Sequence, residues 1–166
     1  MSVFIQPGKT TQDRRTIMSA DNAGSYGTTF LGVGGIHASA ELAIESIFSE
    51  TIALAVSDET TSITTGASKI TFRIQKGLTI SSVRASVTTA PTGSSIIIDI
   101  NKNGSSILST KLSIDVSEET SITASSQPVI SDHSLVIDDE ISIDIDQIGS
   151  GTAGTGVKVY LNCIYE

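Results

Sequence analysis

The stretch "IIIDINKNGSSILSTKLSID", residues 96–115, contains the β-hairpin that decides the fold class. At its centre, Asn103-Gly104 supplies the two residues of positive φ that a tight hairpin turn favours. Apolar residues occupy alternate positions on both sides of the turn, at Ile96, Ile98 and Ile100 and again at Leu108, Leu112 and Ile114. The pattern predicts an antiparallel strand pair with its even-numbered face buried and its odd-numbered face, which includes Asp99, Asn101, Lys111 and Ser113, in water.

The same period of two recurs through the rest of the chain. It is present in "TIALAVS", "KITFRI", "EISIDID" and "VKVYLNCI", and in "LTISSVRASVTT" its phase shifts at Ser81-Ser82, which indicates a β-bulge. Turn-forming segments such as "APTGS", "SSQPVISDHS" and "GSGTAGTG" separate these runs. We therefore predict an all-β fold over residues 50–166, an antiparallel jelly-roll-like β-sandwich of about eight strands.

The alternating positions also predict which side chains fill the sandwich. We expect the apolar residues of the inward faces to form one core between the two sheets. Nine of them are expected there: Ile70, Phe72, Ile98, Ile100, Leu112, Ile114, Ile143, Val159 and Leu161.

Residues 1–49 have a different character. They are rich in Gly, Ser and Thr, show little periodicity, and predict an extended N-terminal arm in front of the sandwich. Within it, "SAELAIESIFSE" favours a short helix near residues 40–48, capped by Ser39. The alternative is that residues 42–48 form another strand.

Composition and charge exclude several function classes. Ten Lys and Arg stand against 18 Asp and Glu, a net charge of −8, and the few aromatic residues are scattered, so we expect no nucleic-acid partner. No apolar run approaches the roughly 20 residues of a membrane span, and the start lacks a signal-peptide pattern. We expect synthesis in the cytoplasm and no membrane partner. Cys163, the only cysteine, alternates with Val157, Val159 and Leu161 and is expected to be a buried apolar residue.

The residues that could carry chemistry form no recognisable catalytic motif. The stretch "SDHSLVIDDEISIDID" holds six acids, but their spacing does not match a calcium loop, and we interpret it as a solvated acidic face. Asp138 and Asp139 are the best candidates if a cation binds. His37 and His133 have no nucleophile motif around them, so neither an enzyme nor a cofactor is expected. Tyr26 and Tyr160 are the aromatic residues that could contact a glycan.

With these strands placed, residues 52–162 resemble a β-sandwich domain of structural proteins from tailed bacteriophages, cyanophages among them. The resemblance is carried by "VRASVTTAPTGS", "IDINKNGSSILSTKLSID", "PVISD" and "ISIDIDQIG". It implies a virion protein on the particle surface, attached to a capsid or a tail fibre, with no catalytic residues to transfer. It does not cover the N-terminal arm.

This resemblance leaves two readings open. In the first, the protein is a capsid decoration (cement) protein whose arm anchors to the major capsid protein, or another virion protein, while the sandwich caps the shell. In the second, it is a short tail or head fibre, or a receptor-binding module for a host surface glycan. The absence of a repeat that could build a shaft favours the first reading. A homo-oligomer is expected, with a trimer preferred.

The arm is expected to make the anchoring contact. Its scattered apolar residues cannot form a compact core, but they can fill separate pockets on a partner. Before residue 40 it carries three bases and two acids, so it has a charge of 3 − 2 = +1, and the remainder must carry −9 to reach −8. The residues predicted to anchor it are Phe4, Ile5, Arg14, Arg15, Phe30 and Leu31.

Overall fold

The computed structural model of the chain describes residues 49–165. The predicted arm, including the helix or strand near residues 40–48, lies outside the described residues. Within 49–165 the structure is built from eleven strands. They are β1 (Ser49–Ala55), β2 (Gly66–Arg73), β3 (Leu78–Ser86), β4 (Ile96–Lys102), β5 (Ser105–Ser106), β6 (Leu108–Thr110), β7 (Leu112–Ile114), β8 (Val129–Ile130), β9 (Ser134–Leu135), β10 (Glu140–Gln147) and β11 (Lys158–Tyr165).

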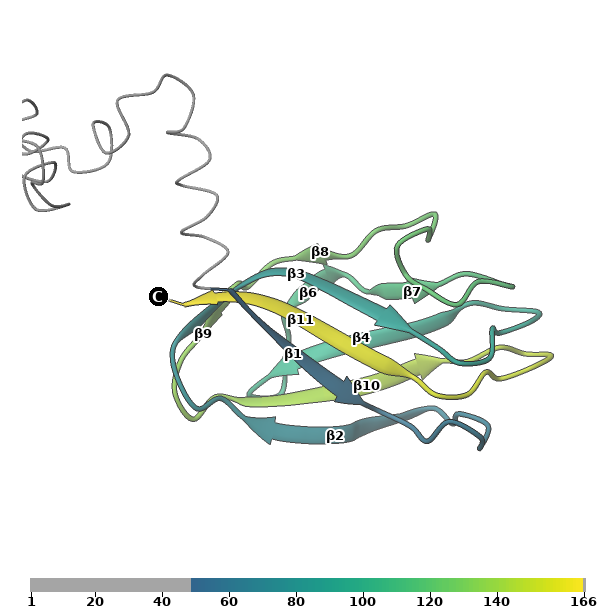
Figure 1. The fold of residues 1–166 in the computed structure, drawn as a ribbon, viewed down its shortest axis with the longest axis horizontal. Coiled ribbons are helices and arrows are strands. Elements are labelled where there is room, and N and C mark those ends of the chain that lie inside the picture. The colour runs from purple at the N-terminus through teal and green to yellow at the C-terminus, as the bar shows by residue number, and fades with distance from the viewer. Residues whose placement is uncertain (1–48, 166) are drawn as a thin grey trace, which may run out of the picture. The chain divides into compact units, whose positions relative to one another are not determined.

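The strands form a jelly-roll sandwich, as predicted. One sheet has the order β1-β11-β3-β9, and the other has the order β2-β10-β4-β5, with β7 also paired to β4. All these pairs are antiparallel, and the first strand pairs with the last, the second with the next to last, and the third with the third from last. Beside these two sheets, β6 and β8 form a separate antiparallel pair. Figure 1 shows β1, β11 and β3 as one layer, with β2, β10 and β4 behind it. This pairing is that of a rolled antiparallel ribbon.

The structure has eleven strands where about eight were predicted, and the added ones are short. Residues 105–114, expected as one return strand, are divided into β5, β6 and β7, and residues 129–135 contain β8 and β9, which belong to different sheets. The segment "SSQPVISDHS", predicted as a turn, instead contains β8 and the start of β9. Its strands are only two residues long, too short for a period of two to be detected.

The hairpin turn and the bulge are confirmed. Asn103 and Gly104 have φ values of 51° and 81°, the two positive values that the tight turn requires. Along β3, Asn162 of β11 pairs with Ser82 while Cys163 pairs with Ile80, so Ser81 is the extra residue of a bulge.

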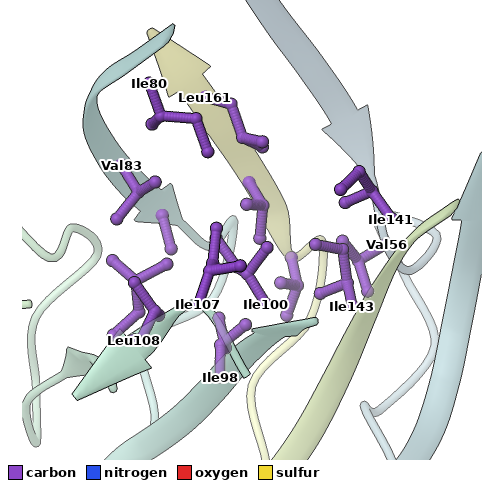
Figure 2. Packing of buried hydrophobic residues seen from close by; sticks show 14 of the residues in the cluster. Val56, Ile80, Val83, Ile98, Ile100, Ile107, Leu108, Ile141, Ile143 and Leu161 are labelled. Carbon is purple, nitrogen blue, oxygen red and sulfur yellow. The ribbon is translucent and has the colours of Figure 1, made fainter. Parts of the chain in front are cut away.

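The core lies between the two sheets, where Figure 2 shows Ile80, Val83 and Leu161 packed with aliphatic side chains of the opposite sheet. Seven of the nine predicted core residues are fully buried, and so is Cys163. Ile70 and Phe72 are only partly buried, which corrects the prediction for both. Their strand, β2, is an edge strand that pairs only with β10, so one side of each side chain stays open to water.

The prediction of a wet odd-numbered face in the hairpin is wrong at its centre. Asp99, Asn101 and Ser113 are buried, with at most 9% of their surface exposed. These side chains lie along the outer surface of the sheet, where they and their neighbours hydrogen-bond across strands and cover one another. Asn101 Nδ2 donates to Asp144 Oδ2 at 3.0 Å, and Asp144 Oδ1 accepts the N–H of Ser68 at 2.6 Å.

Both ends of the sandwich lie at the same end of one sheet. Ser49, the first residue of β1, pairs with Ile164 near the end of β11, as the position of the C-terminus in Figure 1 illustrates. At the other end of these strands, the loops are joined to one another. Thr89 bridges to Thr155, and the N–H of Ile63 donates to the carbonyl of Gly154 at 3.0 Å. The connections therefore form a bonded cap rather than independent loops.

Candidate functional site

The residues predicted from the sequence to anchor the protein are Phe4, Ile5, Arg14, Arg15, Phe30 and Leu31, and all lie outside the described residues. The same holds for His37 and Tyr26. The other candidates, namely the acidic stretch, His133 and Tyr160, belong to the sandwich and can be placed.

The acidic stretch is a set of separate structural contacts. Asp132 pairs with Lys102, Asp138 lies 3.5 Å from Arg73, and Asp146 lies 2.5 Å from Lys111. Its remaining carboxylates are bonded in the same way, to main-chain or side-chain groups nearby. Within residues 49–165, no three Asp, Glu, His or Cys side chains gather as metal ligands would.

Asp138 and Asp139, the candidate cation ligands, make contacts with different residues. Asp139 is buried, and its two oxygens accept the N–H of Val136 at 2.8 Å and the side-chain amide of Asn103 at 2.7 Å. The hydrogen bond from Val136 holds the pKa of Asp139 below its usual value. Asp138 is exposed, has a φ of 71°, and faces Arg73. Asp139 therefore ties the β9–β10 turn to the hairpin turn at Asn103, and Asp138 ties the same turn to β2.

His133 is held by a main-chain group. Its Nδ1 lies 2.7 Å from the carbonyl oxygen of Ile80, and because a carbonyl only accepts, Nδ1 carries the proton and donates. In a catalytic triad, that nitrogen would be bonded to a carboxylate. The bond leaves Nε2 as the free nitrogen of the ring.

His133 lines one side of an open groove of about 410 Å³ beside β3. The groove lies between the second half of β3 and the segment that leads through β8 toward β9 (Figure 1). Its lining residues are Ser81, Ser82, Val83, Arg84, Ser121, Ile122, Gln127, Pro128, Val129, Ile130 and His133. We take this groove, which we call the β3 groove, as the candidate functional site.

The groove exists because the middle of β3 has no neighbouring strand on the side opposite β11. β9 pairs only with Leu78 and Thr79, and the next bridge on that side joins Ser86 to Thr120. Between them, the extra residue Ser81 of the bulge shifts the strand, and the chain from residue 122 to 130 is not paired with it. The sequence predicted the bulge but not the gap, since a gap depends on how far β9 extends.

Arg84 supplies the charge of the groove. It is exposed on the outer face of the sheet, directly opposite Tyr160 of β11. Among residues 49–165 it is the one Lys or Arg whose side chain makes neither a hydrogen bond nor an ion pair with another of these residues. Tyr160 is half-buried, and its hydroxyl lies 3.2 Å from Ser86 Oγ, so it is part of the sheet surface beside the groove.

No family model, no curated protein and no solved structure matches this chain. Among residues 49–165, there is no helix of the length and apolar character that a membrane span needs.

Proposed function

We propose that this protein is a structural protein of a phage virion, a capsid decoration protein. Its N-terminal segment anchors to the major capsid protein, and its β-sandwich caps the shell. The proposal rests on the resemblance of residues 52–162 to virion β-sandwich domains and on one structural observation, the position of the chain ends.

That observation is the pairing of Ser49 with Ile164. Because the sandwich begins and ends at the same end of one sheet, the chain in front of Ser49 joins it there, and we assign the bonded loop cap at the other end to display. A body tethered at one end is the arrangement that a particle-surface protein requires. A homotrimer is part of the proposal, since copies around a symmetry axis of a shell would meet through their sides.

The interior supports a role in which the protein must persist outside a cell. The core is almost entirely Ile, Leu and Val, and the one thiol, Cys163, is 1% exposed. Burial raises the pKa of Cys163 to about 11, so the thiol stays protonated and inert at neutral pH. The sandwich therefore needs neither a disulfide nor a reduced environment for its stability.

The test is a binding assay with particles that lack the protein. The full chain should bind them, and a variant lacking residues 1–40 should fold, as judged by its β-sheet circular dichroism, but should not bind. The double variant Arg14→Ala/Arg15→Ala should bind more weakly than the matched control Lys69→Ala, whose change lies on the sandwich. If the truncated protein binds as well as the full chain, the N-terminal segment is not the anchor.

A second candidate function is the short fibre or receptor-binding module for a host glycan. The observation that favours a binding role of this kind is the β3 groove, where the side chain of Arg84 has no ion-pair partner among residues 49–165 and which an inert shell cap would not need. The number of copies of this protein per virion distinguishes the two functions. A decoration protein should be present at the many equivalent sites of the capsid, whereas a fibre protein should be present in the few copies of a tail part.

A further inference from the structure

The main chain of β3 has a free edge inside the β3 groove. The N–H of Ala85 donates to Ser121 Oγ at 2.9 Å, and the carbonyl of Ala85 accepts the N–H of Ser121 at 3.0 Å. Groups of alternate residues in an antiparallel strand point to the same side, so the N–H and C=O of Val83 also point into the groove. No residue of 49–165 is paired to Val83 on that side.

This free edge is short, because hydrogen bonds to neighbouring segments limit it at both ends. At one end the N–H of Ile80 is bonded to the carbonyl of His133, and at the other Ala85 is bonded to Ser121. The free stretch runs from Ser81 to Arg84, roughly 13 Å at about 3.3 Å per residue. That length accommodates a strand of about four residues.

The wall opposite this edge is apolar and stiff. Ile122 and Val129 are 54% and 50% exposed, although aliphatic side chains of this size are usually buried. The amide nitrogen of Gln127 donates to the carbonyls of residues 121, 122 and 124, at 3.3, 3.1 and 2.8 Å, and so holds the loop behind them. The wall therefore offers fixed apolar contacts for alternate side chains of a ligand.

The charge of the groove is opposite to that of the molecule. Residues 49–165 contain seven Lys and Arg and thirteen Asp and Glu, which gives 7 − 13 = −6. Against this background, the guanidinium of Arg84 is without a carboxylate, and His133 places a ring with one free nitrogen nearby. A carboxylate is the group that a guanidinium binds with two parallel hydrogen bonds.

We propose that the β3 groove binds an extended acidic peptide segment of a partner protein. The segment adds as a short strand to the free edge of β3 at Val83 and places an Asp or Glu side chain on Arg84. A glycan fits less well, because none of the lining residues is Phe, Tyr or Trp and sugar rings are commonly bound against the faces of these side chains. The inference rests on the groove alone and does not depend on the proposed role in a virion.

The experiment selects ligands for the full-length protein from a displayed library of random eight-residue peptides. Enriched peptides should share one acidic residue among β-branched or other strand-forming residues. Arg84→Gln should weaken the best peptide about tenfold or more, the effect of one charge-assisted contact. Lys69→Gln, a change of a half-buried cation outside the groove, should leave its affinity unchanged. Ile122→Asp should abolish binding, whereas Ile137→Asp, at an exposed position outside the groove, should not.

Two further measurements address the pairing itself. Binding should slow hydrogen exchange of the Val83 amide, and N-methylation of alternate peptide amides should prevent binding. The proposal is overturned if no peptides are enriched over the Ile122→Asp protein, or if Arg84→Gln binds the best peptide equally well. It is also overturned if a uronic-acid oligosaccharide binds the groove in an Arg84-dependent way and the peptides do not.

Discussion

A single buried carboxylate organises the outer surface of the second sheet. Asp99 is 4% exposed, and its oxygens accept the Ser106 hydroxyl at 2.6 Å and face Lys111 Nζ at 2.9 Å. Lys111 also reaches Asp146, at 2.5 Å. It occupies the one position between β6 and β7, so the break in the return strand coincides with the residue that neutralises Asp99. A buried charge without such a partner would be costly.

We predict that Lys111→Met destabilises the protein by about 2 kcal/mol, because it leaves the Asp99 carboxylate buried without a cation. The loss is smaller than that for breaking a fully buried ion pair, since Lys111 itself is 43% exposed. Asp146→Asn is the matched control: it removes the exposed partner of Lys111 and should cost less than about 1 kcal/mol. Urea denaturation at pH 7 measures both, and equal losses would contradict the assignment.

The connections between strands depend on glycine for two different reasons. In the β4–β5 turn, Gly104 has a φ of 81°, while a Cβ built there would meet no atom within 4 Å. In the β10–β11 connection, a Cβ at Gly149 would lie 1.9 Å from the carbonyl oxygen of Thr152. The first position therefore needs glycine for its backbone conformation, and the second needs it for space.

This difference predicts unequal effects of the same substitution. Gly104→Ala should cost about 1 kcal/mol, the strain of an L-residue at positive φ. Gly149→Ala should cost more, about 3 kcal/mol, because the loop main chain must move away from Thr152. Thermal unfolding of the two variants gives the comparison. A larger loss for Gly104→Ala would show that the close approach at Gly149 relaxes easily.

At the scale of the whole molecule, carboxylates join segments that are distant in sequence. Asp115 accepts the N–H of Ser125, Asp132 pairs with Lys102, and Asp139 binds Asn103. In each case, hydrogen bonds to the charged form hold the pKa of the carboxyl below its usual value. Asp58 shows the largest effect, since the N–H groups of Thr61 and Thr60 lower its pKa from 3.8 to about 2. Several of the acidic residues therefore stabilise the loops through hydrogen bonds and ion pairs.

We expect acid to unfold the protein through these groups. A carboxyl whose pKa is lower in the folded state contributes stability that is present above its unfolded pKa and is lost as pH falls through its folded pKa. For Asp58 this window runs from 3.8 down to about 2. The urea midpoint of Asp58→Asn should thus lie below that of the wild type at pH 7 and converge with it near the bottom of the window. Glu119→Gln, at an exposed acid, should show no such convergence, and a gap for Asp58→Asn that is constant with pH would refute the expectation.

The local features of the fold could be predicted from the sequence. Alternation of Ile96, Ile98 and Ile100 identified a strand because a period of two reflects only the pleat of one chain. Asn103-Gly104 identified the turn because its φ values depend on those two residues alone. The phase shift at Ser81-Ser82 located the bulge for the same reason.

What the sequence by itself determined, then, was the succession of the long strands, the inward face of most of them and the jelly-roll class. The tertiary structure alone decided which strands lie at an edge, and therefore that the side chains of Ile70 and Phe72 on β2 are only partly buried. It also decided that Asp99 is buried beside Lys111. The pairing of β9 with β3 stops at Thr79, which leaves the main chain of Val83 and the side chain of Arg84 at a groove. These features depend on contacts between segments tens of residues apart, and the period of a single strand holds no information about the length or position of its neighbour.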